Sequence, residues 1–316
     1  ILEKYSKKSK LFMPEVKKII IDEYISGQRL DNFLMNQLKG VPKSKIYSII
    51  RKGEIRINSK RKKPSYKLIN GDELRIPPIK VSKRENLFVP TNAIALIKDA
   101  IVEENDDYIA LNKPEGIASH GGSGISIGVI ETIRNFGKAY RDAKLVHRLD
   151  KDTSGCQIIA KNNKFLRRCN KLISERKIKK TYQSIIHGNW SHKDGIYEIN
   201  IEKNILMGKE RMVRISDGGK IAKTFFKAIE SSKHFSLIQC ELITGRTHQL
   251  RVHLSELGFP IVGDKKYGIK EKKLPKDLEY KKRMYLHANS FISKDLNIHI
   301  EVEPPTEFKK ILKNDE

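Results

Sequence analysis

The chain has 316 residues and a marked excess of basic side chains, with 63 Lys and Arg against 38 Asp and Glu, for a formal net charge of +25 at pH 7. Its 38% hydrophobic content suffices for a globular core, which excludes a disordered tail, and its length fits either one large domain or a large domain with a small companion. No run of about 18 apolar residues occurs, so a membrane-spanning helix is excluded. The charge makes nucleic acid the first candidate partner.

The cysteines indicate a reducing compartment. Cys156, Cys169 and Cys240 are odd in number and scattered, so they support neither a disulfide framework nor a zinc ribbon. The first ten residues lack the apolar core of a secretory signal. We therefore expect a bacterial cytoplasmic protein, and a monomer by default; the basic start leaves an organellar transit sequence open as an alternative.

The first part of the chain predicts a small α+β module. Apolar side chains recur at helical spacing in residues 29–38, and a second short helix is expected from Ser44 until Gly53 stops it. Residues 54–57 then alternate between polar and apolar, and the turn at 70–72 leads into another such segment at 73–77. Residues 1–25 are expected to form an N-terminal extension.

Basic side chains gather on the outward face of this module. The candidate RNA-binding residues are Lys43, Lys45, Arg51, Lys52 and Arg56. Any one of them alone would be read as part of a solvated surface, but the cluster favours RNA. A helix, a basic helix and a hairpin over residues 26–77 resemble the S4 RNA-binding domain.

After a linker predicted at 78–99, a larger domain is expected from 100 to 305, followed by a C-terminal tail at 306–316. Short apolar stretches predict strands at 101–102, 108–111, 157–160, 182–186, 236–240 and 297–300. Helical segments are expected at 127–136 and 165–176. The predicted fold class is α+β, with a mixed, largely antiparallel sheet and flanking helices.

The segment Val146 to Gly155 places an acid, Asp150, directly after basic and polar residues. Nearby arginines keep such an acid ionised, and the positive chain gathers a polyanionic substrate around it. Gly155, with the two hydroxyl residues before it, predicts a tight turn into the strand at 157–160. Alone, Asp150 and Arg148 would be an ordinary ion pair or a turn cap. Further motifs argue against that interpretation.

Two other segments carry unusual polar residues. Residues 108–122 predict a strand followed by a loop rich in Pro and Gly, but without the Gly-Lys-Ser/Thr of a nucleotide-hydrolysing P-loop. Residues 244–253 combine two arginines, two histidines and a glutamine. His248 and His253 are five apart without the His-Glu-x-x-His pattern, so we predict no zinc site.

Three motifs occur in a particular order: Asn112-Lys113-Pro114, His147-Arg148-Leu149-Asp150, and Gly245 to His253. Together they resemble the RluA family of RNA pseudouridine synthases over about residues 100–305. The segments 120–124 and 128–131 make the resemblance to this family more specific. The resemblance implies that uracil is detached from ribose at N1, turned and rejoined through C5, without metal or cofactor.

With the S4-like module in front, the resemblance implies a target in large-subunit (23S) ribosomal RNA. Two alternatives remain: the same reaction on another RNA such as transfer RNA, or a noncatalytic RNA-binding factor in ribosome assembly.

The resemblance also implies residue roles. Asp150 matches the catalytic aspartate, which attacks ribose C1′ or base C6 or assists a glycal route, and the sequence does not choose among these. Tyr182 matches a tyrosine whose ring packs on uracil and whose hydroxyl helps remove the C5 proton; without the motif it would be a core aromatic. Arg251 matches the arginine that pairs with the aspartate.

Arg148 matches the side chain that fills the space left when the target uridine leaves the stack. His147, Arg246 and His248 complete the candidate substrate-binding set, the last two expected to be structural or to contact the RNA backbone. Residues 286–288 resemble a family segment that packs in the core.

Overall fold

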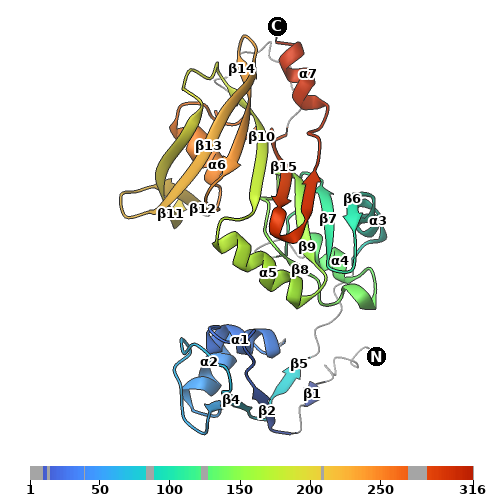
Figure 1. Cartoon of the computed structure of the whole chain (residues 1–316), viewed down its shortest axis with the longest axis vertical. Helices are drawn as coiled ribbons and strands as arrows, with labels where there is room; N and C mark the ends of the chain where they lie inside the picture. The colour runs from blue at the N-terminus through green and yellow to red at the C-terminus, as the bar shows by residue number, and fades with distance from the viewer. Residues whose placement is uncertain are drawn as a thin grey trace, which may run out of the picture. The chain divides into compact units, whose positions relative to one another are not determined.

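The computed structural model describes residues 10–12, 15–38, 40–82, 89–121, 127–207, 210–269 and 283–315. The chain divides into two compact units, residues 1–87 and residues 88–316, and Figure 1 shows the elements of each. Part of the predicted glycine-rich loop at 120–124 falls outside the described residues. Along the described ranges, every helix is too short or too polar to cross a lipid bilayer.

The first unit contains the helices predicted from the hydrophobic periodicity. Helix α1 (Leu30–Gln37) and helix α2 (Lys43–Arg51) pack over a sheet of β2 (Lys17–Ile20), β4 (Glu73–Ile76) and β3 (Arg56–Ile57), in that order and antiparallel. Their inward side chains form one apolar cluster. Its fully buried members include Leu30, Leu34, Ile46, Ile49, Ile57 and Leu74. A further pair, β1 (Lys10–Phe12) and β5 (Lys80–Ser82), is antiparallel.

Two segments predicted to lie outside the domains are ordered parts of them. The predicted extension 1–25 contains β2, which pairs with β4 over its whole length; Ile19 of β2 and Ile21 just after it pack into the core of the unit. The predicted linker 78–99 contains β5 and helix α3 (Thr91–Asp99), since Ile97 of α3 is buried against the second unit's strands.

The second unit is built on one large sheet. Its strands are β6 (Ile101–Glu104), β7 (Tyr108–Lys113), β8 (Lys144–Leu145), β9 (Ser154–Ala160), β10 (Lys179–His187), β11 (Gly195–Met207), β12 (Glu210–Ile215), β13 (Lys220–Ser231), β14 (Phe235–Leu242), β15 (Leu286–Ser293) and β16 (Ile298–Glu301). The order is β12-β11-β13-β14-β10-β15-β9-β7-β6, with β16 on β15 and β8 on β9. The β9–β15 pair is parallel and the other pairs are antiparallel, which confirms the predicted α+β class.

The helices of this unit cover separate apolar clusters of the sheet. Within the described residues they are α3, α4 (Val129–Arg134), α5 (Asn163–Ser174), α6 (Gln249–Glu256) and α7 (Glu307–Lys313), with 3-10 turns at Lys138–Tyr140 and Lys294–Leu296. Helix α7 packs against β14 (Figure 1). The segment 306–316 was predicted as a tail; it is helical because Phe308, Ile311 and Leu312 lie on one face and are buried.

Gly155 connects the sheet to the segment that carries Asp150. It was predicted as a turn residue, but it lies inside β9, opposite Ala288 of β15, with φ of +108°. A Cβ added there would lie 2.2 Å from the carbonyl oxygen of Ala288. Glycine is therefore required by the close approach of the two strands. The core packing expected for residues 286–288 is also present, since all three are buried.

Candidate active site

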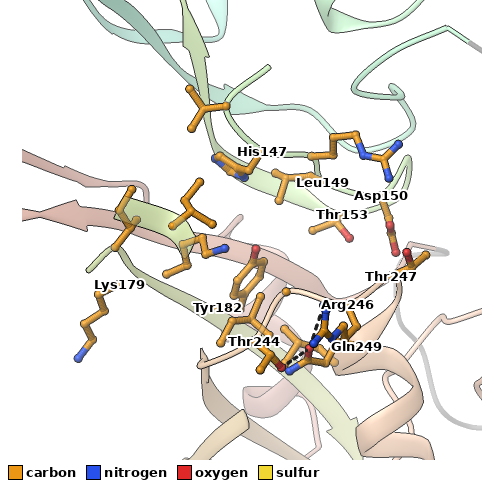
Figure 2. A pocket seen from close by; sticks show the side chains of 18 of the residues that line it. His147, Leu149, Asp150, Thr153, Lys179, Tyr182, Thr244, Arg246, Thr247 and Gln249 are labelled. Atoms are coloured by element: carbon orange, nitrogen blue, oxygen red, sulfur yellow. Dashed lines mark hydrogen bonds between the residues drawn. The ribbon is translucent and has the colours of Figure 1, made fainter. Parts of the chain in front are cut away.

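A cleft of about 1540 Å³ opens in the second unit. One wall is the segment 145–153, which precedes β9; the other walls are the start of β10 and the segment 241–251, which leads into α6 (Figure 2). The predicted catalytic and substrate-binding residues of this unit all line it. They are His147, Arg148, Asp150, Tyr182, Arg246, His248 and Arg251.

Arg251 links two carboxylates at the base of this cleft. Its Nη1 donates to Oδ2 of Asp150 at 3.0 Å, as the predicted pairing requires. Its Nε and Nη2 donate to the two oxygens of Asp264 at 2.7 and 2.8 Å. The Asp150 side chain is 31% exposed and that of Asp264 only 1%. The Asp150 carboxylate is thus accessible from the cleft, while the buried Asp264 fixes the position of Arg251.

The charges of this triad reinforce one another. Burial alone would raise the pKa of Asp264, but hydrogen bonds and charge from Arg251, with the amides of Lys266 and Tyr267, hold that pKa below its ordinary value. Burial opposes the charge of Arg251, and the two acids outweigh it and raise the pKa of its guanidinium. Both groups therefore stay charged at neutral pH.

His248 lies beside this triad in an unusual backbone conformation. It precedes α6 with φ of +53°, in the left-handed region. Its Nδ1 lies 2.8 Å from the hydroxyl of Tyr267, and its Nε2 lies 3.7 Å from Oδ2 of Asp150. Burial lowers the pKa of His248 despite the nearby carboxylate. The imidazole therefore lies next to the Asp150 carboxylate, at a distance too long for a hydrogen bond.

Tyr182 projects from β10 into the same cleft. Its ring is buried, and Figure 2 shows its hydroxyl pointing across the cleft toward the segment 147–153. The hydroxyl forms no hydrogen bond with any of the described residues. Burial, and then the nearby Cys156 and Asp150, raise its pKa. The side chain is accordingly a neutral phenol with a free hydroxyl facing the cleft.

His147 and Arg148 occupy different environments. The Nε2 of His147 accepts a hydrogen bond from the amide of Ile158 at 3.1 Å, and its ring stacks on Phe291. Burial, helped by the charge of Lys180, lowers the pKa of His147 to about 3, so it is neutral. Arg148 is exposed, with Nη1 3.3 Å from Nε2 of His120. His147 thus supports the wall and Arg148 reaches outward.

Arg246 and Gln249 shape the loop before α6. Gln249 Oε1 accepts hydrogen bonds from Thr244 Oγ1 and from the Arg246 amide, both at 2.9 Å (Figure 2). Its Nε2 donates to the carbonyl of Lys223 at 2.9 Å. The Arg246 side chain donates to the carbonyl of Ile221 at 3.2 Å. These contacts hold the loop in place and give the buried Gln249 amide its hydrogen-bond partners.

Two supports behind Asp150 were not among the predicted site residues. Lys113 is fully buried, and its Nζ donates to the carbonyls of Pro114, Ile117 and Lys151 at 2.7, 2.8 and 3.2 Å. Burial lowers the pKa of Lys113 to about 7, although Asp152 and Asp150 oppose the shift. Ser119 accepts from the amide of Leu149 at 3.0 Å and donates to its carbonyl at 2.7 Å. Both ties fix the backbone next to Asp150.

Asp264 is a third residue of the site that the sequence prediction missed. It follows Gly263, whose φ of +73° and contact with the backbone of Arg283 require glycine. Its Oδ1 accepts from the amides of Lys266 and Tyr267 at 2.8 and 3.1 Å. A Gly-Asp pair after an apolar segment is a turn signal in the sequence, but it does not reveal which side chain the acid meets.

In the first unit, four of the predicted RNA-binding residues are exposed on and after α2: Lys43, Lys45, Arg51 and Lys52. Arg56 differs, because its Nε donates to the carbonyl of Gly53 at 2.6 Å and so holds the turn after α2. The exposed group leaves its charges available to a polyanion, whereas Arg56 also has a local structural role.

No group of three or more metal-binding side chains gathers within the described ranges. The two histidines weighed as a zinc pair have separate surroundings: His248 meets Tyr267, while His253 is buried edge-on against Phe226.

Two family models match the chain. Residues 107–256 match the RNA pseudouridylate synthase family and residues 28–74 match the S4 domain. The chain belongs to the RNA pseudouridine synthases and carries an S4 domain before the synthase domain.

Among its relatives, the ribosomal large subunit pseudouridine synthase C of Salmonella typhi is 46% identical over 87% of this chain and 88% of that protein. The protein of the same name from Escherichia coli K12 is 45% identical over the same shares. The one from Haemophilus influenzae is 42% identical over 89% of this chain and 88% of that protein.

Solved structures share the fold. Human RNA pseudouridylate synthase domain containing 4 aligns with a TM-score of 0.58 at 24% identity, over 70% of this chain and 94% of that one. Human RNA pseudouridylate synthase domain containing 1 aligns with a TM-score of 0.53 at 25% identity, over 65% and 83%.

Proposed function

We propose that this chain converts specific uridines of 23S ribosomal RNA to pseudouridine, with Asp150 as the catalytic carboxylate. The observation that carries the residue assignment is the Asp150–Arg251 hydrogen bond at the base of the cleft. The name shared by the bacterial relatives, over seven-eighths of their length, supports the choice of RNA.

In this proposal Asp150 supplies an ionised carboxylate next to the glycosidic bond. Arg251 donates to Oδ2, whereas Oδ1 has no hydrogen bond within the described residues, and the partly exposed side chain lines the cleft. Such an oxygen can attack ribose C1′ or base C6, or stabilise positive charge on the sugar in a glycal route. Arg251 orients the carboxylate in all three cases.

Tyr182 is proposed as the surface on which uracil is held while N1 is exchanged for C5. Its buried ring offers a flat apolar face, and its hydroxyl points into the cleft. Because burial raises its pKa, the hydroxyl is protonated when uracil arrives. A neutral phenol accepts a proton only as it gives up its own, so in this proposal Tyr182 takes the C5 proton while its hydroxyl proton passes to water or to the substrate in the cleft.

Arg148 is proposed to enter the RNA when the target uridine leaves the stack. It is exposed on the wall that carries Asp150, so it reaches outward while Asp150 stays in the cleft. Unstacking a nucleotide costs a few kcal/mol, which an inserted side chain partly offsets. The exposed cluster Lys43, Lys45, Arg51 and Lys52, together with Arg56, is proposed to bind the RNA backbone.

We also propose a bacterial cytoplasmic enzyme that works as a monomer. The bacterial sources of the relatives support the compartment, and the free, buried cysteines suit a reducing environment. A single chain supplies Asp150, Tyr182 and Arg251 to one cleft, so no partner subunit is needed to complete it.

The test is to map pseudouridines in ribosomal and transfer RNA from cells that lack the protein, complemented with wild type or with Asp150→Ala. We expect specific 23S positions to lose pseudouridine and to regain it only with wild type. Loss confined to transfer RNA would show that the enzyme modifies transfer RNA and not 23S ribosomal RNA. Loss of no site, or restoration by Asp150→Ala, would overturn the enzymatic proposal in favour of a noncatalytic RNA-binding role.

A further inference from the structure

Lys180 is a basic side chain in the cleft that has no role in the function proposed above. It lies on β10 two positions before Tyr182, and successive residues of a strand face opposite sides. Thr181 between them bonds to Ser290 on the other face of β10, through hydroxyls 2.6 Å apart. Lys180 and Tyr182 both line the cleft. Their side chains therefore share one wall.

The ammonium of Lys180 is partly removed from water without a compensating acid. Its Nζ lies against the loop before α6, 3.8 Å from where a Cβ on Gly245 would stand. It forms no hydrogen bond or ion pair with any of the described residues, and burial lowers its pKa with no carboxylate opposing the shift. An unpaired, desolvated charge is costly unless an opposite charge arrives.

The neighbouring lysine shows the contrast. Lys179 is exposed, forms an ion pair with Glu241 at 2.9 Å, and points away from Tyr182 (Figure 2). Glu241, the acid on the neighbouring strand β14, is thus already paired with Lys179. The other basic group close by, His147, is neutral because its pKa is about 3. Lys180 is therefore a charged group on β10, unpaired within the described residues, that faces a ligand held against Tyr182.

We propose that Lys180 binds a backbone phosphate of the RNA next to the target nucleotide and so anchors that nucleotide against Tyr182. A phosphate fits better than uracil, because the carbonyls of uracil are neutral and do not compensate a desolvated ammonium. Lysine acts as a point charge toward phosphate and needs no planar geometry. The inference rests on the proposed function, since it assumes that RNA enters this cleft.

The test compares Lys180→Met with the matched control Lys179→Met. Binding of a twelve-residue oligouridine is measured at several salt concentrations, and KM and kcat are measured on a hairpin RNA carrying a uridine that the wild type modifies. We expect Lys180→Met to weaken binding and raise KM about tenfold, with little change in kcat. The slope of log K against log salt should fall by about one. Lys179→Met should resemble wild type.

Phosphate contact is then located with hairpins that carry a single neutral methylphosphonate. One position should weaken wild-type binding about tenfold and have no further effect on Lys180→Met, since both changes remove the same contact. Thermal unfolding checks folding; Lys180→Met should be at least as stable as wild type, because no hydrogen bond is lost.

Two results would overturn the proposal: Lys180→Met matching Lys179→Met in both affinity and salt slope, or a fall in kcat with neither KM nor salt slope changed. The second result would indicate that Lys180 acts on the uracil base and not on a backbone phosphate. If the wild type modifies no uridine, the proposed function fails, and the oligouridine measurement still decides whether Lys180 contacts phosphate.

Discussion

The carboxylate of Asp264 accepts two hydrogen bonds from the guanidinium of Arg251, one from Nε at 2.7 Å and one from Nη2 at 2.8 Å. This fork leaves Nη1 as the group directed at Asp150. A planar guanidinium held at two points cannot rotate freely, so the direction of its third contact is set by the buried acid. Asp264 is thus proposed as a positioning residue for the catalytic carboxylate.

Replacing Asp264 with Asn should reduce kcat about a hundredfold while changing KM little, because misplacement of Arg251 disturbs Asp150 more than RNA binding. Folding should lose about 3 kcal/mol, since a buried arginine is left with a weaker partner. Single-turnover rates and urea unfolding measure the two effects. A variant with full stability loss but wild-type kcat would reduce Asp264 to a structural role.

The same pair has a defined pH dependence. Because the pKa of Asp264 is held below its ordinary value of about 3.9, its contribution is present above that pH and is lost as the pH falls through the folded-state pKa. The stability difference between wild type and Asp264→Asn should therefore be constant from pH 5 to pH 7 and shrink below about pH 4. Urea midpoints across this range check it.

His253 should make the protein sensitive to mild acid. Both of its ring nitrogens are buried without a hydrogen bond in the described part of the chain, and burial lowers its pKa to about 4. The unfolded residue titrates near 6.5, so stability falls as the pH drops from about 6.5 toward 4. His253→Leu should remove about 1.4 kcal/mol per pH unit from this slope. At pH 7.5 it should be as stable as wild type or more so, because no hydrogen bond is lost.

His287 provides the matched control for that measurement. Burial also lowers its pKa to about 4, but its ring bonds to Ser154 Oγ at 2.9 Å and to the Val302 carbonyl at 3.1 Å. His287→Leu should reduce the loss of stability between pH 6.5 and 4 to a similar extent. Its free energy of unfolding at pH 7.5 should be lower than that of wild type by at least about 2 kcal/mol. Equal stability of the two variants at pH 7.5 would contradict the assigned hydrogen bonds.

Much of the fold could be predicted where a local pattern carries the information. Helices α1 and α2 followed from apolar residues at helical spacing, and the buried strands β7, β9 and β10 from short apolar stretches. The long strands β11 and β13 were missed, because one face of each is largely exposed and mixes charged or polar residues with isoleucines such as Ile196 and Ile221. Their pairing, not their composition, makes them strands.

The site was predicted where motifs were continuous in sequence and missed where it depends on distant packing. Asp150, Tyr182 and Arg251 were predicted because each lies in a motif of the family, and the structure brings the three to one cleft. Asp264 was missed because its partner is thirteen residues earlier, across the end of α6. Lys113 was named only within its motif, since nothing in the sequence shows that its ammonium reaches the carbonyl of Lys151.

Gly155→Ala should destabilise the protein by more than about 3 kcal/mol, because the new Cβ would meet the Ala288 carbonyl 2.2 Å away at a φ of +108°. The strand would have to move, and with it the segment that carries Asp150. Gly195→Ala is the control: it also lies in a strand, nothing is within 4 Å of its added Cβ, and its effect should stay within about 0.5 kcal/mol. Thermal unfolding of both variants decides the matter.

Tyr182→Phe separates the two functions proposed for this side chain. The hydroxyl makes no hydrogen bond with the described residues, so its removal should leave stability within about 0.5 kcal/mol of wild type. The ring remains to hold uracil, and RNA affinity should therefore be unchanged. Product formation should fall at least a hundredfold, because relay of the C5 proton contributes about that much in general acid–base catalysis. Single-turnover assays with uridine deuterated at C5 report whether proton removal has become rate-limiting. A Tyr182→Phe enzyme with wild-type rate and no isotope effect would confine Tyr182 to packing on the base.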